Sequence, residues 1–401
     1  MRLIHTSDWH LGRAFHGVGM LAAQARYLDH LVEVVRSERV DAVLVSGDVY
    51  DRALPSPATV ELLSEAVTRL IDAGAQVVLS SGNHDSAIRL GFAARLLERA
   101  GLHIRTSLSG VGTPVLVDGT AIYPLPYLEP STSADPLGAT DRTHAGVLRA
   151  AMLRVSGDLT ARRGPSVVMA HAFVTGGVSS DSERDISVGG VSAVPPSVFD
   201  GADYVALGHL HGAQQVTERV RYSGSPYAMS FGEHPHTKGS WLVEVDETGL
   251  VWSELVAAPV DRPLRVLRGD LDDLLADAAL VGAEQAYCQV TLTDPVRPLG
   301  AMDRIRQRFP HTLVLGFEPR GGATSISSYA AALGRRTDDL DVCCDFLTHV
   351  RGGHPASAPE RSLLAEAVEA SRVERAARLD ELGAMLPGLG DELFAGRTGA
   401  A

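Results

Sequence analysis

Hydrophobic and polar positions follow two different rhythms along the chain. Short apolar runs such as DAVLVSGD (41–48) have the length of buried strands, whereas apolar residues three and four positions apart indicate amphipathic helices. In chain order these patterns predict a strand at 3–7, a helix at 21–35, a strand at 41–48, a helix at 60–71, a strand at 76–82, helices at 88–97 and near 147–155, and strands at 166–170 and 204–208. Alternation of strand and helix is typical of a mostly parallel sheet covered by helices, so we expect an α/β fold.

A long loop interrupts this order. Residues 173–200 are rich in Gly, Ser and Pro, and loops of that length inside a compact domain are uncommon unless they have a function. Alternating strands such as WLVEVDE follow over 215–258. We therefore expect a first domain at 1–258.

The rest of the chain predicts two further parts. Residues 259–335 show a β-α-β-α-β order, with Asp270 as a helix N-cap and a second helix at 297–309, which indicates a small α/β domain. Residues 336–401 are predicted to be helical. From 341 onward, ten Asp and Glu oppose six Arg, a net charge of −4, so this segment is not a basic DNA-binding tail.

Composition limits the class of protein. The chain has 401 residues, 45% hydrophobic and 21% charged, as in soluble globular proteins, and its formal charge of −13 argues against nonspecific binding of nucleic acid. No apolar run approaches the ~18 residues of a membrane span, and the first residues do not resemble a signal peptide. Cys288, Cys343 and Cys344 cannot form a disulfide framework. We expect a cytoplasmic protein that does not act at a membrane.

Candidate metal ligands follow the predicted strands. The carboxyl ends of parallel strands lie at one edge of a sheet, where open α/β proteins bind their ligands. The set consists of Asp8, His10, Asp48, Asn83, His171, His209 and His211. Carboxylate, imidazole and amide oxygen suit Mn²⁺, Fe²⁺ or Zn²⁺, and seven ligands suit two ions that clamp a phosphate. Asp48, in the middle of the set, is the natural bridging carboxylate.

Five segments resemble the motifs of calcineurin-like metallophosphoesterases. They are DWHLG (8–12), SGDVYDRALPSP (46–57), SGNHD (81–85), AHAFV (170–174) and LGHLH (207–211). Two further segments, SSDSERDISVGG (179–190) and YSGSPYAMSFGE (222–233), resemble more narrowly the bacterial SbcD branch of the Mre11 nucleases. The resemblance covers about residues 1–245 and implies a sandwich of helix-covered β-sheets, followed by a capping domain that binds DNA and a helical C-terminal segment.

The resemblance also implies roles for single residues. One metal ion would be held by Asp8, His10, Asp48 and His211, and the second by Asp48, Asn83, His171 and His209. His84 would protonate or stabilise the leaving oxygen, and Asp85 would hold the His84 imidazole. Arg13, Arg52 and Arg89 either contact phosphates or are solvated surface charges, and the sequence leaves both readings open. Asp51 is expected to be a turn or cap residue, and His5 a core histidine.

By resemblance, the function is that of the nuclease subunit of an SbcCD-type complex in DNA repair, recombination and replication. It would use two Mn²⁺ ions as a 3′→5′ exonuclease on duplex DNA and an endonuclease on hairpins or single strands. The protein would be a homodimer bound to the SMC-like ATPase SbcC through its C-terminal helices. Two alternatives remain: a phosphodiesterase for small molecules or cyclic nucleotides, and a non-catalytic scaffold. Activity on duplex DNA tests the first, and metal content tests the second.

Overall fold

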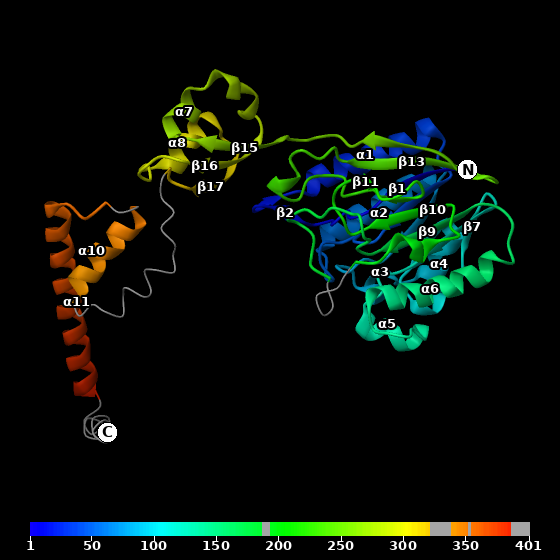
Figure 1. Cartoon of the computed structure of the whole chain (residues 1–401), viewed down its shortest axis with the longest axis horizontal. Helices are drawn as coiled ribbons and strands as arrows, with labels where there is room; N and C mark the ends of the chain where they lie inside the picture. The colour runs from blue at the N-terminus through cyan, green and yellow to red at the C-terminus, as the bar shows by residue number, and fades with distance from the viewer. Residues whose placement is uncertain (187–192, 321–337, 352–353, 386–401) are drawn as a thin grey trace. The chain divides into compact units, whose positions relative to one another are not determined.

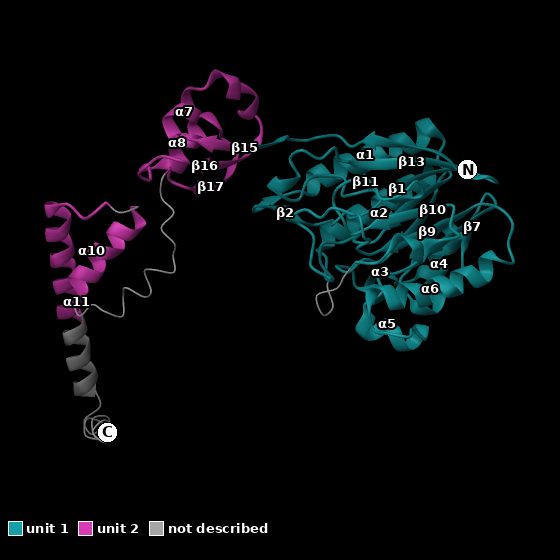
Figure 2. Cartoon of the chain, in the orientation of Figure 1, with its two compact units in different colours: residues 1–265 teal, residues 266–401 magenta. Residues whose placement is uncertain are grey.

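The computed structural model describes residues 1–186, 193–320, 338–351 and 354–385. Within it the chain divides into two compact units, Met1–Arg265 and Val266–Ala401 (Figure 2). The loop predicted at 173–200 and the helical segment predicted at 336–401 lie partly outside the described residues. The division into three domains stays a prediction.

The first unit contains two six-stranded sheets (Figure 1). The first sheet has the order β14 (Gly249–Ala257), β13 (Gly239–Asp246), β1 (Arg2–Thr6), β4 (Ala42–Ser46), β5 (Gln76–Ser80) and β6 (Leu102–Arg105). Strands β1, β4, β5 and β6 are parallel, and β13 and β14 add to them as an antiparallel pair. The second sheet has the order β11 (Gln214–Gln215), β12 (Val220–Tyr222), β10 (Tyr204–Gly208), β9 (Ser166–His171), β8 (Thr120–Pro124) and β7 (Val115–Val117). Strands β8, β9, β10 and β12 are parallel, with antiparallel edges.

The two sheets pack face to face. Leu3 and Leu44 of the first sheet belong to the same buried cluster as Ile122, Met169 and Ala206 of the second. Because side chains alternate along a strand, neighbouring residues face the other way and pack under helices. The fold is therefore the expected helix-covered sandwich. The expectation of one mostly parallel sheet was wrong, because β7 to β12 pair with one another in a second sheet, whereas β13 and β14 return to the first and pair there beside β1.

Four longer helices cover the sandwich: α1 (Leu21–Glu38), α2 (Pro57–Asp72), α5 (Pro130–Leu137) and α6 (His144–Leu159). Leu28 of α1 and Leu63 of α2 share a core with Val43 of the first sheet. Helix α6 contributes Val147 and Ala151 to the core of the second sheet. Ser56 caps α2 by accepting a hydrogen bond from the Thr59 N–H.

The helix predicted at 88–97 is broken. The structure forms α3 (Ala87–Leu90) and α4 (Ala94–Leu97), separated by Ala93 in a left-handed conformation with φ of 58°. Apolar spacing does not show such a break, since Ala is a strong helix former. A short hairpin of β2 (Ala14–Phe15) and β3 (Val18–Gly19) and four 3₁₀ turns, η1 (Glu98–Ala100), η2 (Leu108–Gly110), η3 (Pro196–Phe199) and η4 (Phe231–Glu233), complete the described elements of the first unit.

His5 is the core residue that the sequence predicted. It is fully buried in β1, with Nδ1 2.9 Å from the Tyr204 hydroxyl and Nε2 3.0 Å from the Leu207 carbonyl oxygen. Burial lowers its pKa from 6.5 to about 3, so the ring is neutral at physiological pH.

The second unit begins with a three-stranded sheet in the order β15 (Leu264–Gly269), β16 (Tyr287–Leu292) and β17 (Thr312–Phe317), with α7 (Leu271–Ala276), η5 (Ala278–Ala283) and α8 (Ala301–Arg308). Helix α8 is shorter than the predicted 297–309, because Gly300 precedes it with φ of 61°. Asp270 stands at the N-cap position of α7, but its carboxylate accepts hydrogen bonds from Thr293 and Arg320 and does not cap the helix; the Leu271 N–H donates to the Asp294 carboxylate instead, at 3.0 Å.

Two further helices follow, α10 (Asp339–Val350) and α11 (Ala358–Met385). Arg361 and Arg372 of α11 form ion pairs with Asp341 and Asp339 of α10, at 2.9 and 3.0 Å. Of the helices in the described part of the chain, none combines the length and the apolar character that crossing a membrane requires.

Candidate metal centre

The backbone is strained at the strand ends that carry the predicted ligands. Four of these residues have positive φ: Asp8 at 53°, His10 at 39°, Asp48 at 49° and His209 at 104°. Such conformations are uncommon outside glycine and persist where the surroundings enforce them. Here the loops hold each other, because the Asp8 N–H donates to the Gly47 carbonyl at 3.1 Å and the His10 N–H to the Asp48 carbonyl at 2.9 Å.

Two glycines let these loops approach closely. A Cβ atom on Gly82 would lie 2.1 Å from the Asp48 carboxylate, and one on Gly208 would lie 1.9 Å from the Ser46 carbonyl oxygen. Any side chain at either position would push the two strand ends apart. The glycines inside the SGNHD and LGHLH motifs are therefore required by the packing of the site.

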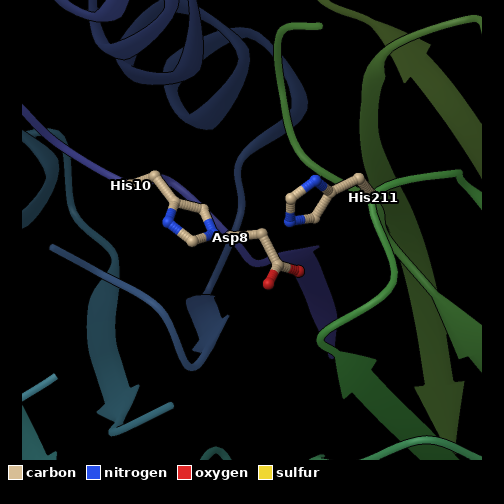
Figure 3. Close-up of side chains that lie close together, drawn as sticks. All are labelled: Asp8, His10 and His211. Carbon is tan, nitrogen blue, oxygen red and sulfur yellow. The ribbon is translucent and has the colours of Figure 1, made fainter. Parts of the chain in front are cut away.

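Three groups of side chains bring metal-binding atoms together, and within each group these atoms lie within 4.8 Å of one another. The groups are Asp8, His10 and His211 (Figure 3); His10, Asp48 and His84; and Asp8, Asp48 and His171. Because the groups share members, they form one cluster. It is assembled from both sheets, since Asp8, Asp48 and His84 follow strands of the first and His171 and His211 come from the second.

Asp48 lies at the middle of this cluster. One oxygen of its carboxylate is 3.4 Å from His10 Nε2 and 3.5 Å from His171 Nε2. The side chain is 2% exposed. Asp48 therefore lies between a proposed ligand of each ion, and its bridging role stays a prediction.

Asn83 and His209 lie beside His171. Asn83 Oδ1 is 2.9 Å from His171 Nε2, and the rings of His171 and His209 are 5.3 Å apart, edge to face. The His209 N–H donates to the Asp8 carboxylate. His209 belongs to none of the three groups, and only its contacts with His171 and Asp8 place it in the site.

The donors fit a divalent cation. His10 is 1% exposed, yet neither of its ring nitrogens has a hydrogen-bond partner within the described structure. Burial lowers the pKa of His10, and burial together with the His171 charge lowers that of His209 to about 3, which leaves both rings neutral with a free lone pair. Asp8 and Asp48 are buried carboxylates, whose desolvation a nearby cation would offset.

The predicted contact between Asp85 and the His84 ring differs from the contacts described, whereas the role of His84 at the leaving oxygen stays a prediction. His84 Nδ1 is 2.9 Å from the Asp51 carbonyl oxygen, so this backbone group orients the ring. The Asp85 carboxylate instead accepts hydrogen bonds from the N–H groups of Val49 at 3.1 Å, Tyr50 at 2.9 Å and Gly82 at 2.9 Å. The idea that Asp85 holds the imidazole is therefore wrong for the contacts described. Asp85 ties the loop after β5 to the loop after β4.

Asp51 is more than a turn residue. Its carboxylate lies 3.4 Å from both His10 Nδ1 and Arg13 Nη1. Asp51 therefore faces the His10 ring, whose nitrogens have no hydrogen-bond partner within the described structure. Of the three arginines left open, Arg13 points to this carboxylate, and Arg89 donates to the Ala53 carbonyl at 3.3 Å. Arg89 is exposed, and so is Arg52, whose side chain is 84% exposed.

Four residues near His211 were missed. Ser182, Glu183, Glu233 and Lys238 all contact it, and Glu233 and Lys238 are almost fully buried. Burial alone would raise the pKa of Glu233, but the nearby His211 ring and the Lys238 ammonium lower it, so the carboxyl is ionised. The only signal in the sequence was that these residues lie in or near the two segments particular to the SbcD branch.

Comparison with known families agrees with this site. The family model for calcineurin-like phosphoesterases matches residues 1–213, and the chain belongs to that family of divalent-metal-dependent phosphoester hydrolases. Residues 260–350 match the SbcD C-terminal family model, described as a type 5 capsule protein repressor C-terminal domain. The two matches together are the combination found in SbcD-type proteins, as the motifs predicted.

Two solved structures align with the chain at low sequence identity and low TM-score. The protein TT1561 of Thermus thermophilus is 12% identical, with 63% of this chain and 98% of that chain covered and a TM-score of 0.37. GAP50 of the Plasmodium inner membrane complex is 10% identical, with 81% and 99% covered and a TM-score of 0.34. The family assignment depends on the two family models.

Proposed function

We propose that the chain is the nuclease subunit of an SbcCD-type complex and hydrolyses phosphodiester bonds of DNA. The observation that carries the proposal is the cluster of Asp8, His10, Asp48, His171 and His211 in a chain that also has an SbcD-type C-terminal domain. The activities would be 3′→5′ exonuclease on duplex ends and endonuclease on hairpins or single strands, in DNA repair and recombination. The chemistry would not need ATP, although the SbcC ATPase would regulate it.

The seven proposed ligands would bind two divalent ions, for which we propose Mn²⁺. Asp8, His10, Asp48 and His211 would hold one, and Asp48, Asn83, His171 and His209 the other. Two bound divalent cations neutralise the charge of a phosphodiester and lower the pKa of the attacking water. The protein's part is to keep the His10 and His209 imidazoles neutral by burial, and to fix Asp48 between His10 and His171.

His84 would act on the leaving group. Its Nδ1 faces the Asp51 carbonyl, and because a carbonyl only accepts, Nδ1 carries a proton. Nε2 is then the nitrogen that, when protonated, donates to the leaving oxygen of the DNA. The backbone N–H of His84 also donates to the Asp48 carboxylate at 2.9 Å, and this hydrogen bond holds His84 beside the proposed metal ligands. A positioned acid of this kind contributes roughly 10²–10⁴-fold to rate.

Exposed apolar side chains support the proposed partners. Ile88, Phe92 and Leu96, directly after the SGNHD motif, are 89%, 81% and 70% exposed, and a second copy of the chain would cover them in the homodimer that the SbcD resemblance implies. On α10 and α11, Phe346 and Leu363 are 50% and 67% exposed. These side chains support docking of SbcC on the C-terminal helices.

The test compares two substrates. Purified protein with Mn²⁺ is incubated with end-labelled linear duplex DNA and, separately, with a small chromogenic phosphodiester. Degradation of the duplex supports the proposal, whereas hydrolysis of the small diester alone would favour the alternative, a phosphodiesterase for small molecules or cyclic nucleotides. If neither is cleaved, the assay is repeated with SbcC and ATP, and failure there as well would contradict the nuclease proposal.

A further inference from the structure

The loop after β9 reaches His211 through two side chains. The Ser182 hydroxyl oxygen is 2.5 Å from His211 Nδ1, and the Glu183 carboxylate accepts a hydrogen bond from the His211 backbone N–H at 2.8 Å. Both the ring and the backbone of a proposed metal ligand are thus held by a segment about thirty residues earlier in the chain, outside the strand that carries it.

A buried ion pair lies behind this contact. Glu233 and Lys238 are 1% and 8% exposed, and their carboxylate and ammonium groups are in direct contact. The Lys238 ammonium also donates to the His211 carbonyl at 2.7 Å and to the Ser225 hydroxyl at 3.0 Å. Glu233 accepts a hydrogen bond from the Ser182 hydroxyl. A buried pair of this kind is costly to desolvate, so a role beyond packing is worth testing.

The hydrogen bonds fix where the protons lie. The Glu233 carboxylate is in contact with the Lys238 ammonium and accepts from it, so the Ser182 hydroxyl uses its single proton to donate to this carboxylate. The same hydroxyl then accepts from His211, which requires a proton on Nδ1. With Nδ1 protonated, the neutral ring keeps its lone pair on Nε2, which is the form that binds a metal ion.

We propose that Ser182, with the buried Glu233–Lys238 pair behind it, is a positioning residue that sets the tautomer and orientation of His211 for metal binding. Partners that hold the second ring nitrogen of a metal-binding histidine in this way typically contribute about 10–100-fold to metal affinity. The inference rests on the proposed two-metal centre, of which His211 serves the ion shared with Asp8 and His10. The inference gives the long loop a function, because its segment with Ser182 and Glu183 contacts His211 and supports the binding of this ion.

The first test needs no metal. Metal-free protein labelled with ¹⁵N-histidine is compared with His211→Gln, which identifies the His211 ring signals, and with Ser182→Ala. We expect a neutral ring protonated on Nδ1 in the wild type and a mixture of tautomers in Ser182→Ala. A wild-type ring protonated only on Nε2, or an identical spectrum in Ser182→Ala, would overturn the inference whether or not the protein is a nuclease.

The second test measures Mn²⁺ binding by calorimetry. Ser182→Ala is expected to weaken one of two binding events by about 10–100-fold and to leave the other unchanged. Ser182→Thr, which keeps the hydroxyl, should bind as the wild type does. Ser179→Ala, an exposed serine in the same loop, is the matched control and should have no effect.

The outcomes separate the two proposals. Wild-type affinity in Ser182→Ala, or an equal loss at both ions, would contradict the positioning role. A wild-type protein that binds no Mn²⁺ would contradict the two-metal centre instead, and the tautomer measurement would then still decide the inference about Ser182.

Discussion

The His209 backbone N–H donates to both carboxylate oxygens of Asp8, each at 3.1 Å. Asp8 follows β1 of the first sheet and His209 follows β10 of the second, so this contact joins the two sheets at the candidate metal centre. Both residues have positive φ. The site is therefore a property of how the sandwich is assembled and not of either sheet alone.

Replacement of Asp48 by Asn is expected to weaken both metal ions. The amide keeps the shape of the side chain but removes the charge between His10 and His171. The loss of metal affinity should exceed the about 10–100-fold that is typical when a residue contacting a metal ligand is replaced. Metal content after dialysis against Mn²⁺ measures it, with the exposed Asp29→Asn on α1 as control. Retention of both ions in Asp48→Asn would exclude a bridging role.

Replacement of His84 by Ala separates chemistry from metal binding. We expect turnover of duplex DNA to fall by about 10²–10⁴-fold, the contribution of a general acid, while the protein keeps two ions. Because His84 also lies in one of the three groups that bring metal-binding atoms together, loss of an ion would show instead that it is a ligand. His30→Ala on α1 serves as the control and should retain full activity and metal content.

Replacement of Asp85 by Asn tests the corrected role of that residue. One amide oxygen cannot replace two carboxylate oxygens that accept from Val49, Tyr50 and Gly82, so we expect a loss of about 1–3 kcal/mol in the free energy of unfolding. Denaturant unfolding of the metal-free protein measures this loss. Unchanged stability together with a fall in turnover would restore the older idea that Asp85 acts through His84.

The strands could be predicted from the sequence, because each is a short, largely apolar run. So could the gathering of Asp8, His10, Asp48, His171 and His211 at their ends, although metal binding by these residues stays a prediction. What could not be predicted was the pairing of strands. Local periodicity shows that β9 and β10 exist but not that they form a second sheet facing the first. Asp85 was misjudged for a similar reason: its neighbour in sequence is His84, but the sharp turn points its carboxylate at backbone N–H groups instead. The Glu233–Lys238 pair needed the fold to bring it to His211.

His5 should make stability depend on pH. Its pKa is about 3 in the folded protein and 6.5 in the unfolded chain, so between these values the unfolded state binds one more proton. Stability is therefore lost as pH falls through this window, by up to about 1.4 kcal/mol per pH unit. His5→Gln, which can still bond Tyr204 and Leu207, should remove that slope when metal-free protein is unfolded at pH 7 and pH 5. An equal slope in both proteins would show that His5 is not buried as a neutral ring.

The most direct test of the account is the position of bound manganese. Anomalous diffraction from crystals grown with Mn²⁺ should show two peaks, one on each side of the Asp48 carboxylate. We predict that Asp8, His10 and His211 contact the first, and that Asn83, His171 and His209 contact the second. A single peak, or two peaks that do not share Asp48, would contradict the two-metal centre on which the proposed nuclease activity depends.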